Sequence, residues 1–545
     1  MAAAYAALVS LMNTVEQIQN HPQLSTSLDH FQIEILREKV YFFLDFIESY
    51  SSHVDDLERW IATAAHAAED LFESHVVWRI RTHEKNSLDL QKVIVDMDLV
   101  REKVLKVKEE RGVRYEQPTA NSSRSVASNR EAIMVGFGGY LDQLLDLLTG
   151  NQSSRQIISI VGMGGTGKTT LAKNTFENSI IKRHFDVRVW VSVSNDYNLS
   201  DIFLEALSHL KELTGTIEMD NERDEYRLGE QLYKGLTGRR YLIVLDDVWS
   251  VEVWDKIRFY FPDNGNRSRL IFTTRLSDVA FYCGSCCVRV NLLDECECWD
   301  LFCVRVFGEE DCPLELEQIG REIAKMCRGL PLSITVIGGL LQKSAKTVEY
   351  WHNVLENIRA ILSSGEGDQC LNVLYSSYSH LPAHLKPCFL YMGTFQEDRE
   401  IPVSRITKLW VAEGFLKPKA ARVLEEVAED YLKDLIDRNL VLVGKYRKNG
   451  KVRSVCIHDL LRDLCISLAD KEKFFSSARV WYRSEDSSVG YLSRKCKLRF
   501  FAYSPANFSE FNLTSSISFV WNLQTLIFQG RCGLVDAPAE IWEMS

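Results

Sequence analysis

The chain has 545 residues, too many for a single hydrophobic core, so its length predicts three or four domains. Apolar residues make up 46% and charged residues 26%, an ordinary globular balance, and the net charge of −11 argues against a dedicated nucleic-acid binder. No apolar run is long enough to span a bilayer, and the first residues lack the features of a signal peptide. The cysteines, all between Cys283 and Cys532, favour reduced thiols in a cytosolic protein.

The first 111 residues predict a bundle of about four helices. Pro22 is their one proline, and they contain no glycine. Apolar residues recur at steps of three and four within 31–44 and again within 57–76, and a further helix is expected over 88–110. Residues 112–130 are small, polar and mildly basic, which is typical of a linker.

From Ile157 onward, short apolar runs alternate with amphipathic segments. The runs are 157–161, 187–194, 241–247 and 269–275. Near-continuous apolar strands between helices predict a parallel sheet that is covered on both faces. Residues from 293 to about 440 look mainly helical, and Asn449-Gly450 then separates two alternating runs, which predicts a tight β-hairpin.

A phosphate-binding loop follows the first of these strands. Gly162, Gly167, Lys168 and Thr169 match G-x-x-x-x-G-K-[ST], between an apolar run and a helical segment. The glycines let backbone N–H groups converge on phosphate, Lys168 adds a charge near the terminal phosphates, and the Thr169 hydroxyl can bind Mg²⁺. The predicted nucleotide-binding loop comprises Gly162, Met163, Gly164, Gly165, Thr166, Gly167, Lys168, Thr169 and Thr170.

Two further strands end in residues suited to the same site. Asp246 and Asp247 close one apolar run, so Asp246 is expected to hold Mg²⁺ and Asp247 to orient an attacking water. Arg275 follows another run, where it could sense a γ-phosphate. The alternatives are helix-capping acids after a strand and an arginine that belongs only to the surface.

An ordered set of motifs carries a family resemblance. These are GMGGTGKTT, VWVSVS, YLIVLDDVW, RLIFTTR, GLPL, LKPCFLYMGTF and IHD, over roughly residues 130 to 470. The set resembles the nucleotide-binding switch module of plant NLR immune receptors. Trp249 closes the motif YLIVLDDVW, and in this it resembles the coiled-coil branch of the family. The chain as a whole is most similar to the late-blight-resistance-like group of that branch.

The resemblance implies a multidomain fold: an N-terminal four-helix bundle, a P-loop α/β parallel-sheet nucleotide-binding domain, a helical domain and a winged-helix domain. A leucine-rich-repeat-like spacing near residue 525 suggests that a repeat region begins at the end of the sequence. The implied domains are a helical coiled-coil domain at 1–111, a linker at 112–130, the nucleotide-binding domain at 131–292, the helical ARC1 domain at 293–375, the winged-helix ARC2 domain at 376–490 and the start of the repeats at 491–545.

In this family ADP is bound at rest, and exchange for ATP with Mg²⁺ activates the receptor. The resemblance places Pro331 of GLPL near the adenine, and it places His458 of IHD on the ADP β-phosphate, with Asp459 anchoring that loop. A third motif, AEDLFES, resembles the acidic motif of the N-terminal bundle, which docks on arginines of the repeat domain. Its acids, Glu69, Asp70 and Glu73, are expected to form one exposed patch, and the alternative is an ordinary solvated helix face.

The implied function is an intracellular disease-resistance receptor, an ADP/ATP switch that triggers defence and hypersensitive cell death. The first helix departs from the pore-forming signature of executor receptors at Tyr5, which favours a sensor that acts through a helper receptor. Implied partners are a pathogen effector or guarded host protein, a helper NLR, the chain's own repeat domain and, on activation, an oligomer. The implied location is cytoplasmic, with plasma-membrane association on activation.

Two other functions stay open from the residues. One is a P-loop ATPase that remodels partners, although a switch requires at most slow ATPase activity. The other is a winged-helix DNA-binding regulator, because the hairpin is basic, but a charged hairpin is also typical of a solvated sheet edge. The basic residues of the hairpin are Lys445, Arg447, Lys448, Lys451 and Arg453.

Overall fold

The computed structural model divides the chain into two compact units, Met1–Pro118 with Tyr378–Ser545 and Thr119–Ser377, and each is described by itself. The structure describes residues 1–20, 29–49, 55–82, 88–111, 135–193, 197–214, 224–283, 286–363, 369–395, 399–418, 422–474, 480–483, 500–503, 511–512, 525–528 and 535–536. The predicted linker at 112–130 and most of 491–545 lie outside these residues. None of the described helices combines the length and apolarity that a bilayer span requires.

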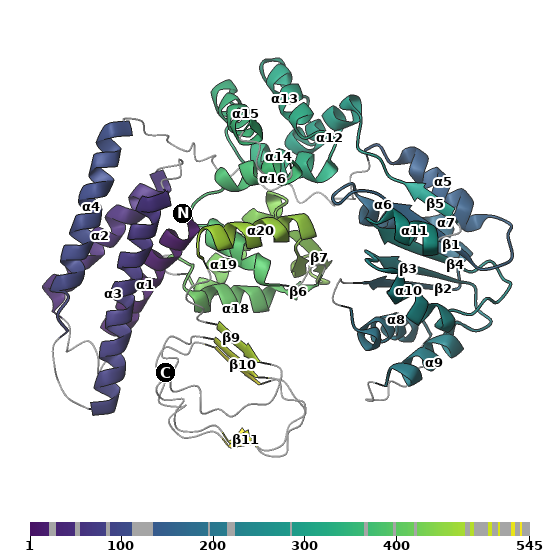
Figure 1. Ribbon diagram of the computed structural model, residues 1–545, viewed down its shortest axis with the longest axis horizontal. Coiled ribbons are helices and arrows are strands. Elements are labelled where there is room, and N and C mark those ends of the chain that lie inside the picture. The colour runs from purple at the N-terminus through teal and green to yellow at the C-terminus, as the bar shows by residue number, and fades with distance from the viewer. Residues whose placement is uncertain are drawn as a thin grey trace. The chain divides into compact units, whose positions relative to one another are not determined.

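Four long helices open the first unit, as predicted (Figure 1). They are α1 (Ala2–Asn20), α2 (His30–Ser49), α3 (Asp55–Thr82) and α4 (Gln91–Arg111). Helix α1 is buried almost all round, because apolar residues cover most of its circumference and the other helices and the winged-helix segment pack against it. Its Asn13 Nδ2 donates to the carbonyl of Leu416 at 3.2 Å, so the bundle and the winged-helix segment share contacts within this unit.

The winged-helix segment builds a small antiparallel sheet among short helices. Its elements are α17 (Lys386–Tyr391), η3 (Met392–Thr394), β6 (Ile401–Pro402), α18 (Val403–Glu413), α19 (Leu424–Asp437), β7 (Leu442–Tyr446), β8 (Val452–Cys456) and α20 (Asp459–Lys471). The strand order is β6-β8-β7. The predicted hairpin is confirmed: Gly450 has φ +78°, and Arg447 N–H donates to the Lys451 carbonyl at 2.7 Å.

Short strands follow in the same unit. A parallel sheet of order β12-β10-β9 comprises β9 (Val480–Arg483), β10 (Phe500–Tyr503) and β12 (Thr525–Phe528). A second parallel pair joins β11 (Phe511–Asn512) and β13 (Val535–Asp536). The expected start of a repeat region stays a prediction.

A five-stranded parallel sheet of order β2-β3-β4-β1-β5 forms the centre of the first part of the second unit. The strands are β1 (Gln156–Val161), β2 (Val187–Ser192), β3 (Tyr241–Asp246), β4 (Arg269–Thr274) and β5 (Cys286–Arg289). The helices are α5 (Gly138–Thr149), α6 (Lys168–Glu177), α7 (Ser179–His184), α8 (Leu199–Thr214), α9 (Glu225–Leu236), α10 (Val251–Ile257), η2 (Arg258–Tyr260) and α11 (Ser277–Cys283).

The apolar strands are buried on both faces, as predicted. In β3, Ile243 and Leu245 share a core with α8, α9, α10 and α11. The alternate residues Leu242 and Val244 share the other core, with α5, α6 and α7. Because successive side chains of a strand point to opposite faces, the two cores together cover every position of β3. The strand ends in a polar residue, Asp246, at the carboxyl edge of the sheet.

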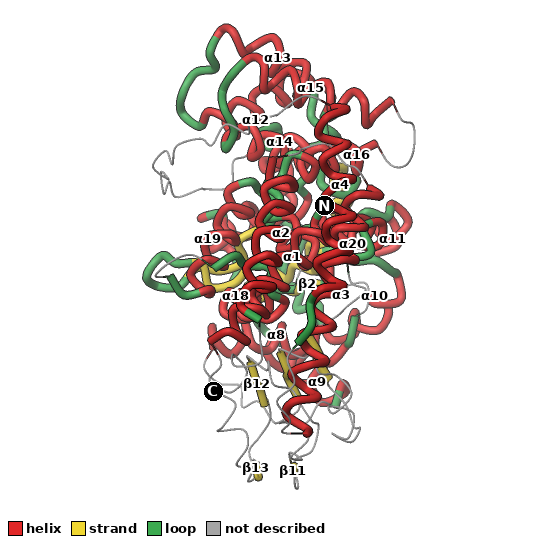
Figure 2. The backbone as a smooth tube through the Cα atoms, turned by 90° about the vertical axis from the view of Figure 1, so that its left-hand side faces the viewer, coloured by secondary structure: helices red, strands yellow, loops and turns green. Residues whose placement is uncertain are grey.

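Helices complete the second unit (Figure 2). They are α12 (Glu295–Phe307), α13 (Leu314–Met326), α14 (Pro331–Gln342), α15 (Val348–Ser363) and most of α16 (Gln369–Ser379), whose last two residues belong to the first unit. Their core surrounds the fully buried Trp351. Helix α12 begins with a capping box, in which Glu297 N–H donates to the Asp294 side chain and Asp294 N–H donates to the Glu297 side chain.

Candidate nucleotide-binding site

The predicted phosphate-binding loop connects the carboxyl end of β1 to the first turn of α6, the position that the sequence pattern requires. Gly165 and Gly167 have φ of +76° and +90°, a left-handed conformation that side chains other than glycine rarely adopt. A Cβ atom on Gly167 would lie 2.7 Å from the Phe137 ring, and one on Gly162 would lie 2.7 Å from the Val290 carbonyl. The path of the loop therefore depends on glycine at these positions.

Lys168 lies inside this loop. It is the first residue of α6 and only 6% exposed, and its Nζ donates to the Met163 carbonyl at 3.0 Å. Burial and, to a smaller extent, the charge of Arg275 lower the pKa of Lys168 to about 8, although the charges of Asp247 and Asp246 oppose this shift. A phosphate group would supply the negative charge that keeps this ammonium protonated.

Other loop residues hold the same turn. Thr166 donates from both its N–H and its hydroxyl to the Met163 carbonyl, at 3.4 and 2.8 Å, while the Met163 side chain is half exposed. Gly164 is buried, and Thr170 lies in α6, where its carbonyl accepts from Asn174. The residues predicted for the loop therefore form one contiguous segment, a turn that leads into the first turn of α6.

A hydroxyl and a carboxylate meet beside the loop. Thr169 Oγ1 donates to Asp246 Oδ1 at 3.0 Å, and Thr273 Oγ1 donates to the same oxygen at 2.5 Å. Burial raises the pKa of Asp246, and these two hydroxyl donors partly offset that rise. Hard oxygen ligands of this kind suit Mg²⁺, so the donor set present fits the predicted metal.

Asp247 and Arg275 also lie together. Asp247 has φ +59°, and its N–H donates to Thr273 Oγ1 at 2.7 Å. Arg275 Nε lies 3.7 Å from Asp247 Oδ1. The indole N–H of Trp249 donates to Asp247 Oδ2 at 3.1 Å, and the Arg275 guanidinium carbon lies 4.6 Å from the centroid of the Trp249 ring. Sequence reasoning used Trp249 only as a family marker and missed this contact, which its place two residues after Asp247 suggests.

The helical segment, which comprises α12 to α16, contacts the phosphate-binding loop through the GLPL motif at residues 329–332. Pro331 is the first residue of α14, and the next residue, Leu332, donates its N–H to the Gly165 carbonyl at 3.2 Å. A Cβ on Gly165 would lie 3.0 Å from Leu332 Cβ, so the two backbones approach closely. Pro331 thus lies next to the phosphate-binding loop, and its contact with an adenine stays a prediction.

His458 and Asp459 belong to the other unit, where they begin α20. His458 is the N-cap residue, and its Nδ1 accepts from Leu460 N–H at 3.3 Å. Asp459 is buried, and its Oδ1 lies against the same ring nitrogen. The predicted contact between His458 and a β-phosphate stays a prediction.

The predicted exposed patch of three acids is wrong. Asp70 is exposed, but Glu69 and Glu73 are buried in the bundle. Glu69 accepts from Ser10 Oγ at 2.8 Å and from Thr14 Oγ1 at 3.0 Å, two hydroxyls of α1 that are one helical turn apart. Because a buried carboxylate is unfavourable without hydrogen-bond donors, these hydroxyls stabilise Glu69 and join α3 to α1.

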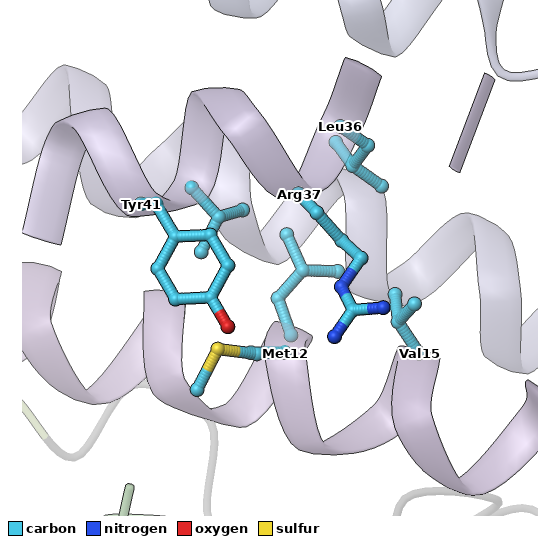
Figure 3. Close-up of a pocket in the computed structure, with 7 residues that line it drawn as sticks. Met12, Val15, Leu36, Arg37 and Tyr41 are labelled. Atoms are coloured by element: carbon cyan, nitrogen blue, oxygen red, sulfur yellow. The ribbon is translucent and has the colours of Figure 1, made fainter. Parts of the chain in front are cut away.

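A small pocket lies between α1 and α2 (Figure 3). Its lining is mostly apolar and comprises Leu11, Met12, Val15, Leu36, Arg37, Val40 and Tyr41. These residues include no carboxylate, imidazole or thiol, and we assign no chemistry to this pocket.

Comparisons with known proteins agree with this geometry. Residues 138–312 match the NB-ARC domain, and residues 394–465 match the disease resistance protein winged helix domain. A solved signal transduction ATPase with numerous domains and a tetratricopeptide-repeat sensor, from Pyrococcus horikoshii, is similar with a TM-score of 0.38 and 17% identity, over 61% of this chain and 43% of that one. That likeness is too distant to inform the site.

Relatives from Solanum demissum are much closer in sequence. The late blight resistance protein homolog R1B-14 is 32% identical over 90% of this chain and 40% of its own length. The late blight resistance protein R1-A is 36% identical over 77% of this chain and 30% of its own length. The chain thus spans well under half the length of these relatives. It is a homologue of the late blight resistance proteins and carries the NB-ARC and winged-helix domains of disease resistance proteins.

Proposed function

We propose that this chain is the switch portion of an intracellular disease-resistance receptor, controlled by exchange of ADP for ATP. One observation carries the proposal: the buried Lys168 ammonium lies within the glycine loop, next to a Thr169–Asp246 pair with the chemistry of a Mg²⁺ site. An NB-ARC domain supports nucleotide binding, and the preference for ADP at rest follows from the family resemblance.

The residues of the loop have distinct roles in this proposal. Backbone N–H groups around Gly165 and Gly167 bind the phosphates, and the N-terminus of α6 adds its positive dipole. Lys168 exchanges the Met163 carbonyl for a phosphate oxygen, which raises its pKa and keeps it charged. Thr169 and Asp246 would hold Mg²⁺, which would supply positive charge against the phosphates. Asp247 would orient a water only for slow hydrolysis, because rapid turnover would erase the signal.

The switch itself rests on differential affinity. A ligand shifts an equilibrium between two arrangements only as far as it binds one better than the other. To reverse a population ratio from 1:99 to 99:1, its binding free energies for the two arrangements must differ by about 5.5 kcal/mol. ADP held both by the phosphate-binding loop and by His458 would stabilise the resting arrangement, with Asp459 fixing the His458 ring. A γ-phosphate, with Arg275 as its cation, would favour the other arrangement.

The wider role is also a proposal. The late blight resistance relatives support a part in disease resistance, with an effector or guarded host protein as the trigger and hypersensitive cell death as the outcome. The departure at Tyr5 from the executor signature favours a sensor that signals through a helper receptor. A cytoplasmic location, membrane association on activation, an oligomer and contact with a repeat domain follow from the same resemblance.

The DNA-binding alternative is weaker. Lys445 of the basic hairpin pairs with Glu400 at 3.0 Å, and the neighbouring helix α19 exposes Glu425, Glu426 and Glu429. These acids would repel a phosphate backbone. Salt-sensitive retardation of duplex DNA by the purified chain would revive the alternative.

The test is the nucleotide content of the purified chain. We expect close to one ADP per molecule after gel filtration, released on denaturation and identified by ion-exchange chromatography. Lys168→Arg should lose most of it, because a larger guanidinium cannot occupy the Lys168 position. Lys182→Arg is the matched control, since Lys182 is half exposed and pairs with Glu177 on α6. An ADP-free wild-type chain, or full occupancy in Lys168→Arg, would contradict the assignment. Sustained ATP turnover would favour the remodelling ATPase.

A further inference from the structure

We propose that Asp247 and Trp249 form a holding site for the Arg275 guanidinium, and that this holding site sets how strongly the chain prefers a nucleoside diphosphate over a triphosphate. The inference rests on the proposed function and goes beyond it: Trp249 becomes a residue that determines specificity by positioning the phosphate sensor. Three residues from the ends of two adjacent strands make the site.

The backbone around the holding site is fixed to the end of β4. Asp247 has φ +59°, and its N–H donates to Thr273 Oγ1 at 2.7 Å. Val248 N–H donates to the Thr273 carbonyl at 2.8 Å, and Thr274 Oγ1 donates to the Val248 carbonyl at 2.7 Å. Arg275 is the residue directly after β4, so these bonds bring its side chain within reach of Asp247.

Trp249 is oriented for its contact with Arg275. Its indole N–H donates to Asp247 Oδ2 at 3.1 Å, while the other oxygen, Oδ1, lies 3.7 Å from Arg275 Nε. The guanidinium carbon lies 4.6 Å from the indole ring, a cation–π distance, and tryptophan is the aromatic side chain that binds cations best. The side chains of Asp247 and Arg275 are only 13% and 20% exposed, so water screens their attraction weakly.

This arrangement creates a competition. Asp247 already offers the guanidinium an anionic partner, and a γ-phosphate that binds Arg275 directly must replace it. Binding of a triphosphate therefore gains only the difference between the two anions and also loses the cation–π contact. A diphosphate leaves the holding site intact, so a stronger holding site gives a stronger preference for ADP.

A double-mutant cycle tests the idea by equilibrium binding. The affinities for ADP and for β,γ-imido-ATP, both with Mg²⁺, are measured by calorimetry on the full chain after its nucleotide has been removed. Trp249→Leu should shift the affinity ratio toward the triphosphate analogue by about five- to thirtyfold, the factor that a largely desolvated cation–π contact corresponds to. In an Arg275→Gln background the same substitution should leave the ratio unchanged.

The chain offers a matched control. Trp299 lies in α12, where the guanidinium carbon of Arg321 lies 4.5 Å from its ring, so Trp299→Leu removes a similar contact in the helical segment. We expect this control to leave the ratio unaltered. An unchanged ratio in Trp249→Leu, a shift toward ADP, or an equal shift in the Arg275→Gln background would overturn the holding site.

A spectroscopic measurement keeps the test independent of a variant that folds poorly. In a chain labelled with 5-fluorotryptophan, the Trp249 resonance is assigned through its loss in the milder Trp249→Phe variant. The resonance should move with β,γ-imido-ATP and stay in place with ADP, because only the triphosphate removes Arg275 from the ring. A resonance that responds equally to both nucleotides contradicts the proposal. If the wild-type chain binds neither nucleotide, the proposed function is overturned as well. If it binds both and the affinity ratio is the same in all four members of the double-mutant cycle, only the holding site is overturned.

Discussion

Glu69→Ala is expected to loosen helix α1 from the N-terminal bundle. Glu69 is fully buried in α3 and accepts from Ser10 and Thr14 of α1, which are also fully buried. A hydrogen bond to a charged group contributes about 1.5–3 kcal/mol, so two such bonds contribute roughly 3–6 kcal/mol. Removal of a buried carboxylate also relieves its desolvation, which offsets part of the loss. We therefore expect a net loss of about 2–4 kcal/mol in the stability of the α1–α3 contact.

Hydrogen exchange of the full chain, read by mass spectrometry on peptides from α1, measures this loss locally and avoids the assumption of two-state unfolding. Since about 1.4 kcal/mol corresponds to a factor of ten, exchange through local opening should accelerate about 30- to 700-fold. Glu69→Gln should give a smaller effect, because its amide retains one carbonyl acceptor.

Asp70→Ala is the control, since Asp70 is the exposed neighbour on the same helix and surface substitutions usually change stability by under about 0.5 kcal/mol. Wild-type exchange in Glu69→Ala, with acceleration in Asp70→Ala, would show that the acidic motif faces the other way and would refute the reasoning.

Other sites allow equally direct tests. Gly167→Ala should weaken ADP binding at least about tenfold in calorimetry, because its Cβ would meet Phe137; Gly238→Ala shares the positive φ in open space and should bind normally. The pKa of Lys168 is about 8 without phosphate and should rise when phosphate binds. The affinity for ADP should therefore be constant below pH 8 and fall about tenfold per pH unit above it. If the Lys168→Arg variant shows the same pH dependence, Lys168 is not its cause. Asp459→Val should cause cell death without a trigger in a leaf expression assay, whereas exposed Asp463→Val should stay silent. Silent, well-expressed Asp459→Val protein would count against the proposed role of Asp459 in fixing the His458 ring of the resting arrangement.

The features that sequence predicted best are those whose local pattern has a single physical explanation. Left-handed glycines between an apolar strand and a helix define the phosphate loop, and Asn449-Gly450 defines a hairpin, because few other residues adopt those backbone angles. The parallel sheet followed from strands with no polar face.

The errors came from contacts between segments distant in sequence. The spacing of Glu69, Asp70 and Glu73 indicates that they lie near one another on a helix, but it does not reveal that two hydroxyls of α1 bind Glu69 or that Glu73 is buried as well. The same limit applies to Trp249, whose partner Arg275 follows a different strand. Periodicity identifies the faces of an element, and the partner of each face depends on tertiary packing.

The bond from Leu332 to Gly165 has a mechanical consequence. Helix α14 starts with a proline, which has no N–H, so Leu332 carries the first donor that the helix can offer, and that donor is directed at the phosphate loop. A rotation of helices α12 to α16 away from the sheet would have to break this hydrogen bond, and it would distort a turn that tolerates little change in its backbone angles. Departure of the nucleotide and rotation of the helices would then be one concerted motion, so a stiffer joint at residues 329–332 should slow both by the same factor.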